Sequence, residues 1–374
     1  MTDPHLATPA GRPRARALGI PFDGKPGRFN AVTDVAGVSV GTVTLVSGEG
    51  PLVIGAGPVR TGVTAILPRP PAEAAVPVMA AVGVLNGTGE LTGAWQIEET
   101  GLADWPITLT NTASCGTTRD GTLHWMRKHC PDVIDAAWKL PVAAETYDGH
   151  LNDINGFHVT VAHTVEAIEK AAGGPVEEGS LGGGTGMLCY QFKGGNGTAS
   201  RLVEDPAGSF AVGVFVQANF GAREELMVRG VPVGKHLPLA EPTSPPAHKR
   251  DGSIIVAIAT DAPLLPHQLK RVARRATLGI ARTGTAGRQS SGDIFLAFST
   301  ANSEAISASD GLARADYLPD ARLNPLFTAT VEATEEAILN ALVANETMTG
   351  RDGHVAEALP HDELRALLKR YGRL

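Results

Sequence analysis

The chain has 374 residues, of which 43% are hydrophobic and 19% charged, so it can bury a large core. Its net charge of -7 argues against a nucleic-acid partner, and no stretch approaches the roughly 20 apolar residues that a membrane-spanning helix needs. The three cysteines have no CxxC spacing, and the N-terminus lacks the apolar core of a secretory signal, so we expect a cytoplasmic globular protein without a disulfide framework.

Short apolar runs bounded by turn residues recur along the chain and predict buried strands. In chain order they cover residues 62–68, 77–85, 157–163, 210–219, 253–260 and 293–300. Helical periodicity predicts helices at residues 164–172 (with Thr164 as N-cap), 266–282, 330–345 and 361–372. Strands in series with long helices at intervals predict an α+β fold in which both sheet faces are covered.

Glycine is the unusual residue type, with 44 copies, many of them in clusters flanked by apolar runs. The clusters are residues 86–93 (NGTGELTG), 179–187 (GSLGGGTGM) and 193–200 (KGGNGTAS). They predict tight turns and close backbone approach in a sheet-rich core. The second cluster lacks the GK[ST] of a phosphate-binding loop, so a nucleotide cofactor is not expected.

The junction Gly252-Ser253 lies between a Pro-rich polar loop and a buried strand, in the stretch HKRDGSIIVAIATDAP. Locally, Ser253 reads as an ordinary turn residue. The alternative is self-cleavage, in which the serine hydroxyl attacks the preceding carbonyl and a new N-terminal serine is released. A free α-amine has an ordinary pKa of about 7.7–8.0, so it can act as general base to its own hydroxyl. The sequence contains no GxSxG nucleophile elbow that would compete with this interpretation.

The segments DGSIIVAIATDAPL and RTGTAGRQSSGDIFLAFSTAN resemble the DmpA/BapA family of L-aminopeptidase/D-esterases and β-aminopeptidases. The likeness extends upstream, in the expected order, from about Arg16 onward. The motifs that carry it are NAVTDVAGVSVGTVT, RTGVTAILPR, NGTGELTG, LTNTASCG, ETYDGHLNDINGFHV, GGGTGM and VQANFG. The resemblance implies a four-layer αββα sandwich, similar to other N-terminal nucleophile hydrolases.

The resemblance also implies roles for particular residues. Ser253 takes the position of the nucleophile, and Gly252–Ser253 becomes the bond that is cleaved. In SSGD, Ser291 and Asp293 match a serine and an acidic residue that hold the nucleophile's amine. Their i, i+2 spacing at the start of a strand puts both on one face, although a simple turn before the strand is the alternative.

Three residues upstream match other parts of the family's site. Asn219 in VQANFG corresponds to an oxyanion-stabilising asparagine, and Tyr147 in ETYDG to a tyrosine with the same duty. Glu145 would share the side of Tyr147 in an extended segment and would bind the substrate's ammonium, with a surface salt bridge as the alternative. For Trp138 we expect a place in the core, with a wall of the substrate pocket as the alternative.

The family implies one catalytic domain over residues 1–374, cleaved into an α chain (1–252) and a β chain (253–374), with processed heterodimers assembling as homotetramers. The expected partners are small peptides, amides or esters. The histidines form no HExxH motif and no carboxylate cluster of metal-ligand type, so neither a metal nor a cofactor is expected.

Three alternatives remain at this point. An acyltransferase resembling the ornithine acetyltransferases would share the self-cleaving architecture, but those enzymes typically use threonine. A nylon-oligomer hydrolase also usually uses threonine. An unprocessed, inactive homologue with a binding role would keep the Gly252–Ser253 bond intact.

Overall fold

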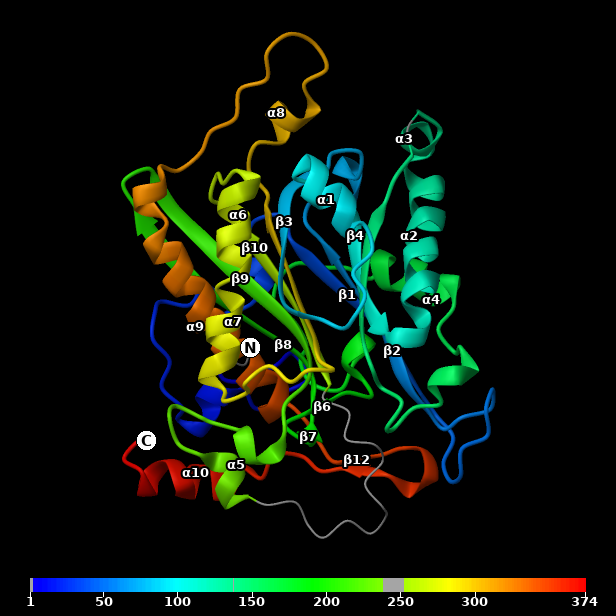
Figure 1. Ribbon diagram of the computed structural model, residues 1–374, viewed down its shortest axis with the longest axis vertical. Helices are drawn as coiled ribbons and strands as arrows, with labels where there is room; N and C mark the ends of the chain where they lie inside the picture. Colours follow the sequence, from blue (N-terminus) through cyan, green and yellow to red (C-terminus); the bar gives the residue numbers. More distant parts are fainter. Residues whose placement is uncertain (1–2, 137, 238–251) are drawn as a thin grey trace.

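The computed structural model describes residues 3–136, 138–237 and 252–374 (Figure 1). In this part of the chain, eight strands lie on one hydrogen-bonded path, and a ninth, β5, pairs with β4 beside it. The path is divided into two sheets at β4, whose first residues pair with β3 and whose later residues pair with β2. The first sheet contains β1 (Ser39–Ser47), β2 (Val59–Leu67), β4 (Leu102–Asn111) and β5 (Pro141–Thr146). The second contains β3 (Val78–Gly87), β8 (Gly195–Asp205), β9 (Gly208–Asn219), β10 (Ser253–Thr260) and β11 (Gly292–Ser299).

Helices cover the outer faces of both sheets (Figure 1). Two contact the first sheet, α2 (Cys115–His129) and α4 (Val161–Glu169). Three lie over the second, α6 (Pro266–Ala273), α7 (Ala276–Arg282) and α9 (Asn324–Val343). This arrangement confirms the predicted four-layer αββα sandwich.

Shorter elements lie around these layers. The helices are α1 (Ala94–Thr100), α3 (Pro131–Ala136), α5 (Val233–His236), α8 (Ser303–Ser307) and α10 (His361–Arg370). Two small hairpins are formed by β6 (Leu188–Cys189) with β7 (Phe192–Lys193) and by β12 (Met348–Thr349) with β13 (Val355–Ala356).

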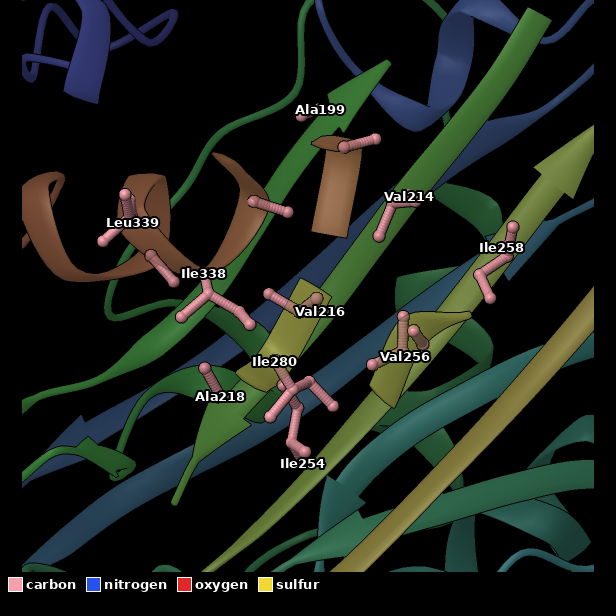
Figure 2. Packing of buried hydrophobic residues seen from close by; sticks show 14 of the residues in the cluster. Ala199, Val214, Val216, Ala218, Ile254, Val256, Ile258, Ile280, Ile338 and Leu339 are labelled. Atoms are coloured by element: carbon pink, nitrogen blue, oxygen red, sulfur yellow. The ribbon is translucent and has the colours of Figure 1, made fainter. Parts of the chain in front are cut away.

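The strand β10 is apolar along its whole length because both of its faces are covered. Ile254, Val256 and Ile258 point to the helical side, where they belong to the cluster that also contains Ile280 of α7 and Ile338 of α9 (Figure 2). The alternate residues Ile255, Ala257 and Ala259 belong to the cluster between the two sheets. Every residue of β10 is buried, as the pattern predicts for a strand inside a sandwich.

Three predicted elements differ from the structure. The helix predicted over residues 330–345 is α9, which begins earlier, at Asn324. Residues 157–163 alternate like a strand, but α4 begins at Val161, because the hydroxyl of Thr160 caps it by accepting the N–H of His163. Thr164 is therefore inside this helix. The predicted helix 266–282 is divided at Arg274–Arg275, since α6 contacts β3 and β11 whereas α7 packs against α9.

Strand direction brings several strand ends to one edge of the second sheet. Because β9 is antiparallel to β10, the last residue of β9, Asn219, pairs with the first residue of β10, Ser253. Because β10 is parallel to β11, the starts of both strands meet, and Ile254 pairs with Asp293. The end of β3 joins them, since Gly87 pairs with Gly292. Polar residues far apart in the sequence are thus neighbours in space.

Among the residues that the structure describes, no helix is both long and apolar enough to cross a membrane. In the same part of the chain, no group of three or more histidine, cysteine, aspartate or glutamate side chains is arranged to hold a metal ion.

Candidate active site

Ser253 is the first residue of β10 and is 7% exposed. Its hydroxyl oxygen accepts a hydrogen bond of 3.1 Å from the backbone N–H of Gly292, at the start of the neighbouring strand β11. On its other side Ser253 pairs with Asn219. A hydroxyl whose lone pair is already oriented by a backbone donor is held in one direction, which favours a defined attack geometry.

Gly252 fits its position only because it lacks a side chain. A Cβ there would fall on the carbonyl oxygen of Asn219, 2.5 Å from its carbonyl carbon and 3.1 Å from the Cα of Phe220. The preceding Pro-rich loop, residues 238–251, lies outside the described residues. Glycine therefore lets the chain pass close to β9 immediately before Ser253.

Ser291 and Asp293 lie together, as their spacing predicts. The hydroxyl of Ser291 donates to the carboxylate Oδ1 of Asp293 at 2.6 Å, and both side chains are buried. Burial raises the pKa of Asp293, while hydrogen bonds from Ser291 and from the Ile254 backbone act in the opposite direction. The carboxylate is next to the start of β10, through the pairing of Asp293 with Ile254.

The amide of Asn219 is fixed at both ends. Its Oδ1 accepts the backbone N–H of Leu188 at 2.8 Å, and its Nδ2 donates to the backbone carbonyl of Tyr147 at 3.0 Å. One acceptor and one donor bond determine which way the amide faces, and the second Nδ2 hydrogen is available as a donor. With Asn219 opposite Ser253, this amide can bind negative charge that develops beside the serine.

Tyr147 follows β5 and is half-buried. Its backbone carbonyl anchors Asn219, and its ring packs over Gly149, where a Cβ would collide with the end of the ring. The two residues predicted to stabilise an oxyanion are therefore in direct contact through the Tyr147 backbone.

Glu145 is buried and not part of a surface salt bridge. Its carboxylate accepts the backbone N–H of Glu90 at 3.0 Å and the hydroxyl of Thr112. Burial raises its pKa, the two hydrogen bonds lower it, and the charge of Glu90 raises it further. A Cβ on Gly89 would lie 3.3 Å from the Glu145 Oε1 and 3.2 Å from the Cα of Gly292. Glu145 and Gly292, whose N–H contacts the Ser253 hydroxyl, thus border the same space at the Cα of Gly89.

The sequence motifs did not identify three groups that contribute to the site. They are the backbone N–H of Gly292, the backbone of Gly89 and the hydroxyl of Thr112. Gly89 and Thr112 lie within the quoted motifs NGTGELTG and LTNTASCG, and Gly292 is the glycine of SSGD. Their roles depend on backbone position, which side-chain chemistry does not reveal. Trp138, expected in the core, is 74% exposed, so that expectation is wrong.

The comparisons with known proteins cover nearly the whole chain. Peptidase family S58 matches residues 30–356. The chain is 53% identical over 380 aligned residues to the beta-peptidyl aminopeptidase BapA of Sphingosinicella microcystinivorans, spanning 98% of this chain and 95% of that protein.

Two solved structures are similar as well. The l-aminopeptidase d-ala-esterase/amidase of Ochrobactrum anthropi, described as a prototype for the serine aminopeptidases and a variant of the Ntn (N-terminal nucleophile) hydrolase fold, is 47% identical with a TM-score of 0.90, covering 97% of this chain and 100% of its own. A beta-aminopeptidase from Burkholderia sp. is 46% identical with a TM-score of 0.85, covering 96% and 99%. These matches do not favour an acyltransferase or a binding protein. The chain belongs to peptidase family S58 and is a serine aminopeptidase with the N-terminal nucleophile hydrolase fold.

Proposed function

We propose that this aminopeptidase processes itself at Gly252–Ser253 and then uses Ser253 as both nucleophile and general base. The observation that carries the proposal is the meeting of Ser253, Asn219 and Gly292 at one sheet edge, with Asp293 beside the start of β10. The catalytic domain comprises residues 1–374 and becomes an α chain (1–252) and a β chain (253–374).

In the processing step, the Ser253 hydroxyl attacks the carbonyl carbon of Gly252. The C–N bond breaks, the acyl group moves to the hydroxyl oxygen as an ester, and the nitrogen takes the proton and becomes the free α-amine of Ser253. Water then hydrolyses the ester, leaving a carboxylate on Gly252. The absence of a Cβ at Gly252 supports this step, because the attacked carbonyl is free of side-chain crowding.

In the catalytic cycle, the unprotonated α-amine accepts the proton of its own hydroxyl as the oxygen attacks the substrate's carbonyl. The Asn219 amide, assisted by the Tyr147 hydroxyl, stabilises the resulting oxyanion. Ser291 and Asp293 hold the amine in place. The resulting ammonium gives its proton to the leaving amine or alcohol, and the substrate's N-terminal residue remains as an ester on Ser253. Water then hydrolyses the ester, which releases the free amino acid and restores the hydroxyl of Ser253.

Glu145 explains why the enzyme would require a free N-terminus. Its buried carboxylate and Gly292, whose N–H contacts the Ser253 hydroxyl, border the same space at the Cα of Gly89. A substrate ammonium bound there would form a charge-assisted hydrogen bond in a site shielded from water. The substrates are accordingly short peptides, amides or esters with a small N-terminal residue. The names of its relatives extend the choice to L-α-, D-alanyl and β-amino acids.

Processing is tested by mass spectrometry of the purified protein under denaturing conditions. We expect two pieces, residues 1–252 and 253–374, and N-terminal sequencing of the smaller piece should begin Ser-Ile-Ile-Val. Ser253→Ala should remain intact and hydrolyse nothing. An active preparation in which the chain is intact would refute self-processing, and turnover by the alanine variant would place the nucleophile elsewhere.

Substrate class is tested with p-nitroanilides of Gly, L-Ala, D-Ala and β-Ala, each compared with its N-acetylated form. Hydrolysis restricted to the free amines supports an aminopeptidase, whereas equal hydrolysis of the acetylated forms contradicts it. A cytoplasmic location, which rests on the composition of the chain, belongs to the same proposal. So does assembly as a homotetramer of processed heterodimers, which rests on resemblance to the family. Sedimentation velocity of the processed protein tests the assembly.

A further inference from the structure

Lys193, at the end of the short strand β7, is fully buried, including its side-chain ammonium. The ammonium donates to the backbone carbonyls of Met187 at 2.8 Å and Gly194 at 2.6 Å. It contacts none of the side chains of the candidate active site directly. The burial of Lys193 needs an explanation, because a lysine side chain is almost never fully buried unless it is paired with a carboxylate or another acceptor.

The carbonyl of Met187 and the N–H of Leu188 belong to the same peptide group. Lys193 donates to the oxygen of this peptide, and the nitrogen of the same peptide donates to Asn219 Oδ1 at 2.8 Å. The Asn219 amide in turn donates through Nδ2 to Tyr147. The ammonium is thus linked by hydrogen bonds, through the Met187–Leu188 peptide, to the Asn219 amide opposite Ser253.

Hydrogen bonds arranged in series polarise one another. A cation at the carbonyl end of a peptide makes its N–H a stronger donor, and a stronger donor at Oδ1 makes the Asn219 Nδ2 hydrogens more positive. Both effects favour negative charge next to Asn219. They also fix the amide's orientation, because Oδ1 faces a strong donor.

The position of the β6–β7 hairpin relative to β9 is tightly defined. Leu188 pairs with Lys193 across the hairpin. A Cβ on Gly194 would lie only 2.5 Å from the carbonyl oxygen of Ala218, the residue before Asn219. The hairpin therefore lies directly against the end of β9, and a small shift of the Met187–Leu188 peptide would be felt by the Asn219 side chain.

The two carbonyls that Lys193 contacts do not need it as a partner. The Met187 carbonyl also accepts the N–H of Gly194 at 2.8 Å, and the Gly194 carbonyl also accepts the side-chain amide of Asn345 at 3.1 Å. An apolar residue in place of Lys193 would leave neither carbonyl unsatisfied and would avoid burying a charge. Stability alone therefore does not account for this lysine.

The electrostatic surroundings of Lys193 are mixed. Burial lowers its pKa to about 7, with nearby Arg12 acting in the same direction, while Cys189 and Asp148 act to raise it. Negative charge that develops beside Asn219 during the reaction would favour the ammonium in the same way.

We propose that Lys193 is a positioning residue that orients and polarises the Asn219 amide through the Met187–Leu188 peptide. This inference rests on the proposed function, in which Asn219 binds the oxyanion. In this proposal the segments KGGNG, which begins with Lys193, and GGGTGM, which ends with Met187, support catalysis without contacting the substrate.

The test compares kcat and KM of the processed enzyme on L-Ala p-nitroanilide for four proteins: wild type, Lys193→Met, Asn219→Ala and the double variant. Methionine keeps the length of the side chain and removes the donor. We expect Lys193→Met to lower kcat about tenfold with KM within about twofold, because the lost interaction acts in the transition state. In the Asn219→Ala background the same change should lower kcat by less than about twofold.

The matched control is Lys170→Met, which removes an exposed lysine that pairs with Glu166 one helical turn away, and should leave both parameters unchanged. The thermal melting temperature separates an effect on the site from an effect on the fold. If Lys193→Met does not yield folded protein, Lys193→Gln is measured instead, and the same loss of kcat is expected because the shorter amide carries no charge.

The outcomes distinguish the two levels of the argument. A folded, processed wild type that hydrolyses none of the p-nitroanilides refutes the proposed function, and the role of Lys193 with it. An active wild type whose Lys193→Met variant keeps its kcat refutes the role of Lys193 alone. The role of Lys193 is also refuted if the fold-loss of kcat in the double variant equals the product of the two single losses. Lys193 would then act independently of Asn219.

Discussion

Replacing Gly252 with alanine should stop processing while leaving the rest of the protein folded. The added Cβ would fall on the Asn219 carbonyl oxygen and lie 2.5 Å from its carbonyl carbon. Ordinary carbon–carbon contact begins at about 3.5 Å, so the chain before Ser253 must move by about 1 Å or more. The obstacle is backbone at the end of β9, which cannot rotate away as a flexible side chain can.

The size of the effect follows from that displacement. A misplacement of about 1 Å between reacting groups can cost about a hundredfold in rate. In the proposed processing step Ser253 attacks the carbonyl of the residue that is displaced, so the loss would apply directly to cleavage. We expect Gly252→Ala to accumulate as intact chain, with a processing rate at least about a hundredfold below wild type.

The assay follows the intact mass of freshly purified protein over time at fixed temperature and pH. Gly116→Ala is the control, because Gly116 lies in α2 with nothing near enough to meet a Cβ, so the change should leave processing unaffected. It should also stabilise the fold by about 0.5–1 kcal/mol through helix propensity. Processing of Gly252→Ala at the wild-type rate would refute the idea that the close contact with Asn219 aligns the cleaved bond.

The remaining predictions concern the processed enzyme. Asn219→Ala should lower kcat by about a hundredfold or more, and a change confined to KM would point to substrate positioning instead. Glu145→Gln should raise KM for free-amine substrates about tenfold or more. Protonation of Glu145 at low pH should raise the wild-type KM for free-amine substrates. Because burial raises the pKa of Glu145, this increase should begin at a higher pH than for an ordinary glutamate. A KM independent of pH would contradict this. Asp293→Asn removes a negative charge that favours the Ser253 ammonium, so the amine's pKa should fall and the acidic limb of kcat/KM should move to lower pH. An unmoved limb would exclude Asp293 as the neighbour of the base.

The apolar pattern predicts that both faces of the second sheet are covered, because β10 and β11 are apolar on both faces. The order of the four layers comes from the resemblance to the family and not from the pattern. The pattern predicts the helix of α4 but starts it at residue 164 instead of Val161, because FHVTVAH alternates like a strand and the N-cap is Thr160 instead of Thr164. Local alternation and helix capping compete there, and packing of α4 on α2 and β2 favours the helix.

The candidate residues could be named from motifs, but their contacts could not. Asn219 is recognisable in VQANFG, yet its partner Leu188 lies on a separate hairpin. Glu145 could equally have been a surface residue, and its burial beside Gly89 follows only from the way the two sheets pack. Backbone donors such as Gly292 have no side-chain signature, so their role depends on the register of β11 relative to β10.

A serine that becomes the N-terminus of a new chain by cleavage, and is also the nucleophile, can occupy few places in a compact fold. Cleavage inside a strand would break the ladder on both sides, whereas cleavage in a remote loop would leave the new amine far from any site. Ser253 avoids both problems, because it is the first residue of β10 and Gly252 is outside the strand. After cleavage β10 would still lie between β9 of the α chain and β11 of the β chain, and β11 would still pair with β3 of the α chain. The two chains would therefore remain joined by the ladders and by the cores on both faces, so the new N-terminus can be released without loosening the groups around it.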